Sequence, residues 1–348
     1  MTPQSKIIFV GALWNGSTAL HRMLALRSLA GEVIAVNSDP DPSAIPAASL
    51  LHRIQRRLVG PQDLTGANAQ ILSAAENTAP DILWIDKGLT IAPTTMRAVR
   101  ERHPRCLMVG YSPDDMTNPG NQSRRFLDGL SEYDVYFTTK SYGVRELTTL
   151  GARHVIFIGN AYDSATHRPC TPTMQQRAEF GGVVGFIGQW EAERSSSICA
   201  LARAGVPVRV WGQDWTKCRC SAKSLRLERR PIWGEHYSLA LCSFDINLCF
   251  LRKSNRDRQT TRSVEIPACG AFMLAERTEE HLALFEEGKE AEFFAGDTEL
   301  IEKVRYYIAH PDVRQAIATA GRERCLRSEY SNLARMRQML SVVDGLRH

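Results

Sequence analysis

The chain of 348 residues is long enough for two domains of about 150 residues each. Its 43% hydrophobic and 23% charged residues are typical of an ordinary globular protein, and its net charge of +5 suits an anionic ligand without the dense basic stripe of a nucleic-acid-binding protein. No apolar run approaches the ~20 residues that a membrane span needs, and the first apolar segment is too short for a signal peptide, so the sequence predicts a cytoplasmic location.

Strands and helices alternate along the first half of the chain. Short runs rich in Val and Ile predict strands, apolar residues at helical spacing predict helices, and Ser17 is expected to cap the first helix. The predicted strands span residues 6–12, 32–37, 81–86, 105–111, 134–138 and 154–158, and the predicted helices span 18–29, 50–59, 93–103 and 142–150. This order favours a parallel sheet that is covered on both faces.

A segment of different composition follows at residues 160–177. It contains two prolines and scattered polar residues without periodicity, which is typical of a linker between domains. We therefore expect an N-terminal domain over residues 1–170, a second domain over 171–328, and a last helix over 329–348 that packs back on the first domain.

The alternation restarts in the second half, where Asp297 is expected to cap one helix and Pro311 to lie in the first turn of the next. The predicted strands span 182–187, 206–211, 245–250, 272–275 and 291–294, and the predicted helices span 191–204, 237–242, 260–268, 279–287, 297–309, 311–328 and 331–346. The predicted fold is α/β, with two Rossmann-like, doubly wound parallel-sheet domains that face a central cleft. Such crevices are where open α/β sheets bind ligands.

The basic segment around the start of the predicted helix over residues 260–268 is the most informative segment for function. It contains Lys253, Asn255, Arg258 and Arg262. Free backbone N–H groups and the positive end of the helix dipole make such a helix start an anion site, and a cationic clamp would stabilise a diphosphate leaving group. The alternative is a basic loop that is simply solvated.

Four motifs in the second half resemble a known family. They are GFIGQWEAER at 185–194, VWGQDW at 210–215, RSVEIPACG at 262–270 and LFEEGKE at 284–290. Together they resemble the spore-maturation-protein-like (CgeB-type) glycosyltransferases, GT-B proteins related to the retaining glycosyl transferases of group 1. The first half of the chain is similar to this family more loosely.

The resemblance implies a glycosyltransferase that moves a sugar from a nucleoside diphosphate sugar, with UDP favoured, to an acceptor. It implies retention of configuration and no metal ion or other cofactor. The acceptor class stays open among a glycan, a protein, a lipid-linked intermediate and a small molecule. Two alternatives also stay open: a sugar-nucleotide epimerase of the same fold, and a non-catalytic protein that binds sugar nucleotides.

Two acidic residues receive roles from the resemblance. Glu265 stands where the relatives have a glutamate that holds the ribose hydroxyls, and a carboxylate can accept both hydroxyl hydrogen bonds. Asp257 stands where the relatives have a glutamate that contacts the donor sugar, so the charge is kept and the reach is shorter by one methylene. The alternative for Glu265 is a surface carboxylate paired with Arg262. The alternative for Asp257 is a loop carboxylate between two arginines.

Other residues of the second half are assigned more coarsely. The resemblance makes Arg194 a phosphate contact, and its alternative role is an ordinary ion pair with Glu191. Gly188 would let the backbone approach the ligand. Trp233 and Gly234 lie in the loop that the resemblance places near the base.

The turn after the first strand carries Gly11 and Gly16. The three-glycine dinucleotide fingerprint is absent here. In GT-B enzymes this turn faces the donor phosphates, and the alternative is a plain tight turn.

No metal site is predicted. Cys218 and Cys220 form one close pair, but only His236 is near, whereas zinc would need two more ligands at suitable spacing. Asp114 and Asp115 provide too few ligands for a hard cation.

Overall fold

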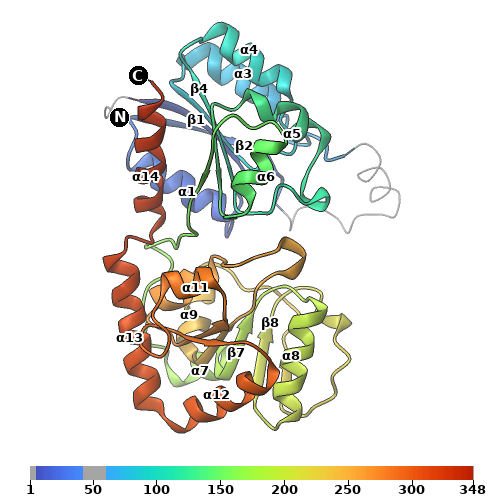
Figure 1. The fold of residues 1–348 in the computed structure, drawn as a ribbon, viewed down its shortest axis with the longest axis vertical. Helices are drawn as coiled ribbons and strands as arrows, with labels where there is room; N and C mark the ends of the chain where they lie inside the picture. The colour runs from blue at the N-terminus through green and yellow to red at the C-terminus, as the bar shows by residue number, and fades with distance from the viewer. Residues whose placement is uncertain (1–4, 42–59, 348) are drawn as a thin grey trace. The chain divides into compact units, whose positions relative to one another are not determined.

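The computed structural model describes residues 5–41 and 60–347. The predicted helix over 50–59 lies outside the described residues. The chain divides into two compact units, an N-terminal unit of residues 1–159 with 332–348 and a C-terminal unit of residues 160–331. Each unit is built around its own six-stranded sheet (Figure 1).

The sheet of the N-terminal unit has the strand order β2-β1-β3-β4-β5-β6. Every strand pair in it is parallel. Parallel neighbours require crossover connections, and helices supply them. The strands are β1 (Lys6–Gly11), β2 (Glu32–Asn37), β3 (Ile82–Asp86), β4 (Leu107–Ser112), β5 (Val135–Thr138) and β6 (Val155–Phe157).

Helices cover both faces of this sheet, because successive side chains of a strand point to opposite sides. Ile8 and Val10 of β1 pack into one buried cluster, and Ile7 and Phe9 pack into another that includes Met336 from the end of the chain. The helices are α1 (Thr18–Arg27), α3 (Ala67–Thr78), α4 (Pro93–Arg102), α5 (Arg124–Gly129), α6 (Gly143–Thr149) and α14 (Asn332–Gly345). Helix α14 lies against α1 (Figure 1).

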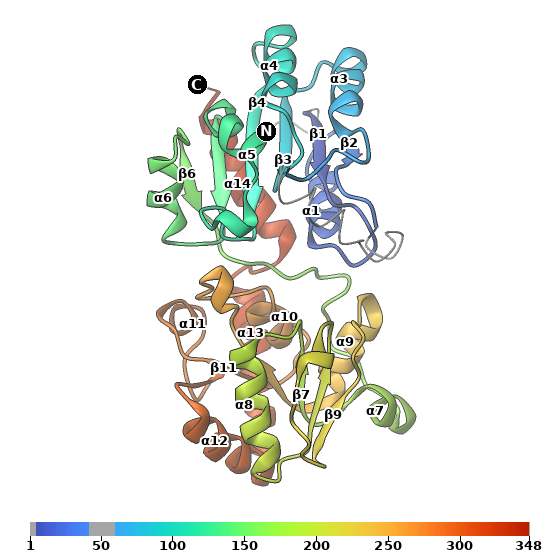
Figure 2. The same cartoon turned by 90° about the vertical axis from the view of Figure 1, so that its right-hand side faces the viewer.

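The sheet of the C-terminal unit has the order β12-β11-β10-β7-β8-β9 and is also parallel throughout. Its strands are β7 (Gly182–Ile187), β8 (Val208–Trp211), β9 (Leu225–Leu227), β10 (Phe244–Cys249), β11 (Met273–Glu276) and β12 (Glu292–Phe294). Its helices are α7 (Met174–Phe180), α8 (Ala192–Arg203), α9 (Gly234–Ser243), α10 (Arg262–Ala268), α11 (Glu279–Leu284), α12 (Asp297–Ala309) and α13 (Pro311–Arg327), several of which Figure 2 labels.

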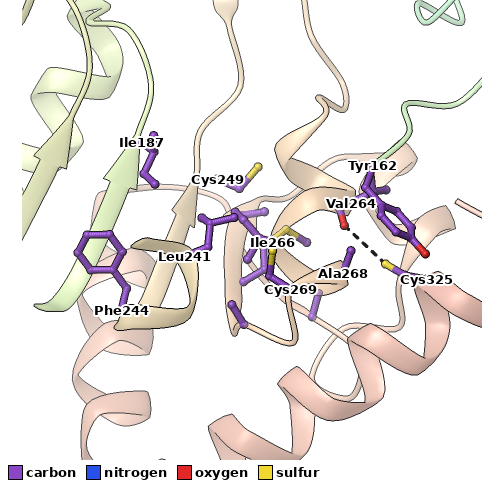
Figure 3. Close-up of a cluster of buried hydrophobic side chains, with 14 of the residues drawn as sticks. Tyr162, Ile187, Leu241, Phe244, Cys249, Val264, Ile266, Ala268, Cys269 and Cys325 are labelled. Carbon is purple, nitrogen blue, oxygen red and sulfur yellow. Dashed lines mark hydrogen bonds between the residues drawn. The ribbon is translucent and has the colours of Figure 1, made fainter. Parts of the chain in front are cut away.

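Helix α10 is short but firmly packed. Val264 and Ile266 belong to a buried cluster that also contains Leu241 of α9 and Cys249 of β10 (Figure 3). The thiol of Cys325 on α13 donates a hydrogen bond to the carbonyl of Val264 at 3.7 Å. The start of α10 is therefore held by the core of the unit.

The α/β fold predicted from the sequence is confirmed, with corrections in detail. Ser17 caps α1 as expected, since its side chain accepts hydrogen bonds from two N–H groups of the first turn. Helix α7 begins inside the segment expected to be a linker, because Thr173 and Gln176 form a reciprocal capping box. Asp297 is the first residue of α12 rather than its cap.

Candidate active site

The strand order of the C-terminal unit defines a topological switch point. From β7 the chain continues to β8 on one side, and from β10 it continues to β11 on the other, while β7 and β10 are direct neighbours. The loops after these two strands therefore diverge at the carboxyl edge of the sheet. In open α/β sheets this is where ligands bind. Arg194 follows β7, and Arg262 follows β10.

Arg194 lies in the first turn of α8 and is only 4% exposed. Its Nη1 donates to the carbonyl of Gln189 at 3.1 Å, and its Nε donates to the carbonyl of Leu251 at 3.3 Å. Its Nη2 is buried and has no hydrogen-bond partner among the described residues. A buried donor without an acceptor is costly, so this nitrogen is a natural contact for an anion.

Arg262 is brought to the same place by α10. The guanidinium carbons of Arg194 and Arg262 lie 5.7 and 5.8 Å from the centroid of the Phe186 ring. The Nε of Arg262 is buried and, within the described part of the chain, has no hydrogen-bond partner either. Burial, followed by the neighbouring charge of Arg262, lowers the pKa of Arg194 to about 10. Two cations held this close favour a bound anion between them.

Acidic side chains offset only part of this positive charge. Glu191 forms ion pairs with Arg194 at 3.6 Å and with Arg252 at 3.1 Å, so both roles considered for Arg194 remain compatible with the geometry. The electrostatic environment of Arg194 also includes Asp257. Three guanidiniums and two carboxylates leave a net positive site.

The loop after β10 supplies the remaining predicted residues. Lys253 forms an ion pair with Glu276 at the end of β11, which neutralises its charge within the unit. The side-chain nitrogen of Asn255 donates to Asp257 at 2.8 Å. Arg258 is exposed, and its carbonyl accepts a hydrogen bond from a threonine hydroxyl at 2.6 Å. These contacts fix the shape of the loop.

Glu265 is buried, at 6% exposure, one helical turn after Arg262. Its Oε2 accepts a hydrogen bond from the Tyr237 hydroxyl at 2.7 Å, and its Oε1 lies 3.8 Å from Nε2 of His167. It is thus neither a surface carboxylate nor paired with Arg262. Both partners were missed from the sequence, since His167 lies in the expected linker and nothing local connects Tyr237 with α10.

The glycines and tryptophan assigned to this site lie around the same edge of the sheet. Gly188 directly follows β7, and its carbonyl accepts the indole N–H of Trp215 at 2.8 Å. A side-chain carbon at Gly188 would lie 2.7 Å from the Phe186 ring. Trp233 is 51% exposed directly before α9, and Gly234 has a φ of +58° that favours glycine.

Gly11 and Gly16 belong to the N-terminal unit, whose switch point lies between β1 and β3. Gly11 ends β1 beside Asp86, because an added side-chain carbon would lie 3.1 Å from the Cβ of Asp86. Asp86 forms a buried ion pair with Arg22 at 2.7 Å. Gly16 has a φ of +94° and enters the turn before Ser17.

Three further observations concern hollows, metal sites and membrane helices. A hollow of about 500 Å³ lies on the C-terminal unit between α7 and α9, and its lining contains none of the predicted site residues. In the described parts of the chain, no group of three or more His, Cys, Asp or Glu side chains is placed to hold a metal ion. No described helix has the length and apolar character needed to cross a membrane.

The sequence and the structure both have known counterparts. Residues 194–341 match the model of a family described as glycosyl transferase-like. Among curated proteins, no sequence gives a significant match. The structure is similar to that of HepE from Anabaena, solved with UDP and glucose, with a TM-score of 0.63 at 12% identity over 98% of this chain and 100% of that one.

Two other solved structures are similar over nearly their whole length. Sucrose-phosphate synthase from Thermosynechococcus elongatus gives a TM-score of 0.66 at 12% identity and covers 99% of both chains. A glycosyltransferase from Rickettsia africae gives a TM-score of 0.67 at 10% identity, over 99% of this chain and 98% of that one. The chain therefore has the GT-B fold.

Proposed function

We propose that this chain, whose residues 194–341 match the glycosyl transferase-like family model, transfers a sugar from a nucleoside diphosphate sugar to an acceptor with retention of configuration. The observation that carries the proposal is the pair Arg194 and Arg262 at the switch point, each with a buried nitrogen that lacks an acceptor. Together with the motifs of the second half, it also supports the CgeB-type affiliation.

A diphosphate fits this pair for a chemical reason. Negative charge grows on the leaving diphosphate as the bond to the sugar breaks, and preorganised donors in a buried site stabilise that charge more than water does. Arg194 and Arg262 repel each other in the structure, since the charge of Arg262 helps to lower the pKa of Arg194. The anion would relieve their repulsion and satisfy both free nitrogens.

The nucleoside would bind next to this pair. We assign Glu265 to the ribose hydroxyls, because it lies one turn along α10 from Arg262 and keeps unused acceptor positions. The loop before α9, with Trp233 and Gly234, would contact the base. UDP is the favoured nucleotide, since the structurally similar HepE was solved with UDP and with UDP-glucose.

We propose that the N-terminal unit binds the acceptor. The ion pairs of two of its carboxylates agree with a retaining mechanism. An inverting enzyme needs a free base to deprotonate the acceptor. At the ends of β3 and β4, however, Asp86 is paired with Arg22 and Asp114 with Lys87 at 2.7 Å. In a retaining, front-face transfer the leaving phosphate itself takes the acceptor proton, so these carboxylates need not be free.

The test is to incubate the protein with UDP-, GDP-, dTDP- and CMP-sugars, with and without acceptors from a cell lysate. Transfer or donor hydrolysis supports the proposal, whereas clean interconversion of donors supports the epimerase alternative. Binding without bond cleavage supports the non-catalytic alternative. The proposal is wrong if no sugar nucleotide binds and the Arg262→Ala and Glu265→Ala variants behave as the wild type does.

A further inference from the structure

Glu265 faces a competition within its own helix. Arg262 lies three residues earlier, and side chains at this spacing share one face of a helix and attract each other when oppositely charged. An ion pair between them would occupy the proposed ribose acceptor and neutralise half of the proposed phosphate clamp. In the structure these two described residues form no ion pair, and Glu265 instead contacts Tyr237 and His167.

Tyr237 holds one carboxylate oxygen from the neighbouring helix α9. Its hydroxyl donates to Oε2 at 2.7 Å. Burial, reinforced by the charge of Glu265, raises the pKa of Tyr237 well above its usual value, so that the hydroxyl stays protonated and remains a donor. A tyrosine has few rotatable bonds, and this one is therefore a stiff support for the carboxylate.

His167 faces the other oxygen and is itself oriented. The backbone N–H of Asp163 donates to Nδ1 of His167 at 2.9 Å, so the neutral ring carries its proton on Nε2. This nitrogen lies 3.8 Å from Oε1 of Glu265. The His167 ring packs edge-on against Tyr237, with centroids 5.6 Å apart. The segment that carries His167 is held by a further contact, in which the hydroxyl of Ser238 donates to the carbonyl of Thr166 at 2.7 Å.

We propose that Tyr237 and His167 are positioning residues, which hold the Glu265 carboxylate away from Arg262 and aim it at the ribose diol of the donor nucleotide. This inference rests on the proposed function, because it needs a nucleoside diphosphate at this site. It assigns the ribose selectivity of the enzyme to residues outside the motifs that suggested the function. It also explains why Glu265 and Arg262 can lie on one short helix without forming an ion pair.

The test compares UDP with 2′,3′-dideoxy-UDP, which lacks the diol, by isothermal titration calorimetry. Wild-type protein should bind UDP at least about tenfold more tightly than the dideoxy compound, as expected for hydrogen bonds to a charged group. Tyr237→Phe should reduce this ratio to about one- to threefold, because the carboxylate turns toward Arg262. A merely structural tyrosine would weaken both ligands equally and leave the ratio unchanged.

Tyr307→Phe is a matched control. The Tyr307 hydroxyl also donates to a buried glutamate of the same unit, Glu292, far along the chain from α10. This variant should keep the wild-type ratio. If Tyr237→Phe does not give a cooperative thermal transition, His167→Asn replaces it, since asparagine can still accept the N–H of Asp163 but cannot reach Glu265.

Two results would overturn the inference in different ways. If the wild type binds UDP and dideoxy-UDP equally, or binds neither, the proposed ribose role of Glu265 is wrong and the inference falls with it. If the wild type discriminates and both Tyr237→Phe and His167→Asn keep the full ratio, the proposed function stands and the positioning role is wrong.

Discussion

Replacing Arg194 by methionine should separate ligand binding from folding. Burial and the charge of Arg262 lower the pKa of Arg194 from its usual value to about 10, which corresponds to roughly 3 kcal/mol of unfavourable free energy for the charged group. The variant relieves this cost. It also removes the charged donor of two hydrogen bonds, to the carbonyls of Gln189 and Leu251, which costs about 3–6 kcal/mol. The two effects partly offset each other, so the free energy of unfolding should fall by about 0–3 kcal/mol.

Binding of UDP should respond far more strongly. A hydrogen bond to a charged partner contributes about 1.5–3 kcal/mol, so loss of the Arg194 contact should raise the Kd for UDP roughly 10- to 100-fold. Isothermal titration calorimetry measures the Kd, and urea denaturation without ligand measures the free energy of unfolding. The expected signature is a large loss of affinity in a protein that still unfolds in one cooperative transition.

Arg209→Met is the matched control for this experiment. Arg209 is also a buried arginine of the C-terminal unit, but it is fully engaged, with Glu228 at 2.8 Å and with the carbonyls of Ala178 and Gly181. Glu228 keeps Arg226 at 2.6 Å, so the loss of Arg209 acts mainly through its carbonyl contacts and should lower the stability by about 1–3 kcal/mol while leaving the Kd for UDP unchanged. If Arg194→Met instead behaves like Arg209→Met, with reduced stability and unchanged affinity, Arg194 is structural and the reasoning is refuted.

Three further predictions concern stability and the support of the site. Burial lowers the pKa of His281 from 6.5 to about 4, so its neutral form contributes stability that is present above pH 6.5 and lost as the pH falls toward 4. Urea denaturation across this range should show a steeper decline for the wild type than for His281→Gln, and equal declines would contradict the burial effect. In Gly188→Ala the added methyl group would lie 2.7 Å from the Phe186 ring and should displace it from the two arginines. Calorimetry should then show weaker UDP binding. Gly296→Ala, whose methyl group meets open space, should bind UDP as the wild type does. Asp86→Asn leaves a buried guanidinium uncompensated and should cost about 3–5 kcal/mol in urea denaturation; a loss below about 1 kcal/mol would mean that the ion pair is effectively solvated.

The fold was predictable where hydrophobic pattern alone decides the structure. The strands of both sheets are short apolar runs, and Trp211 at the end of β8 is buried in the core. Helix α3 escaped prediction because its buried face consists of one isoleucine and two alanines, Ala67 and Ala75, which give a weak period. Strand β9 has only three residues, too few for a pattern.

The residues of the candidate site could be proposed from the sequence, but the contacts between them could not. The sequence places Arg194 and Arg262 near helix starts, yet their approach over one Phe186 ring depends on β7 and β10 being neighbours. The ion pair between Lys253, for which we predict a phosphate contact, and Glu276 also joins residues that no local pattern connects. Such contacts join residues far apart in the chain, and only the strand order brings them together. The roles assigned to the site residues, Asp257 and Arg258 among them, stay predictions.

Helix α14 has a consequence for how the protein is made. It is the last helix of the chain, yet Met336, Met339, Leu340 and Val343 are buried in the core of the N-terminal unit. On the ribosome, the first sheet emerges long before the helix that covers one of its faces, whereas residues 160–331 form a continuous segment that can fold in a single pass. The unit that is synthesised first is thus completed last, and the apolar side chains that α14 covers stay exposed until then.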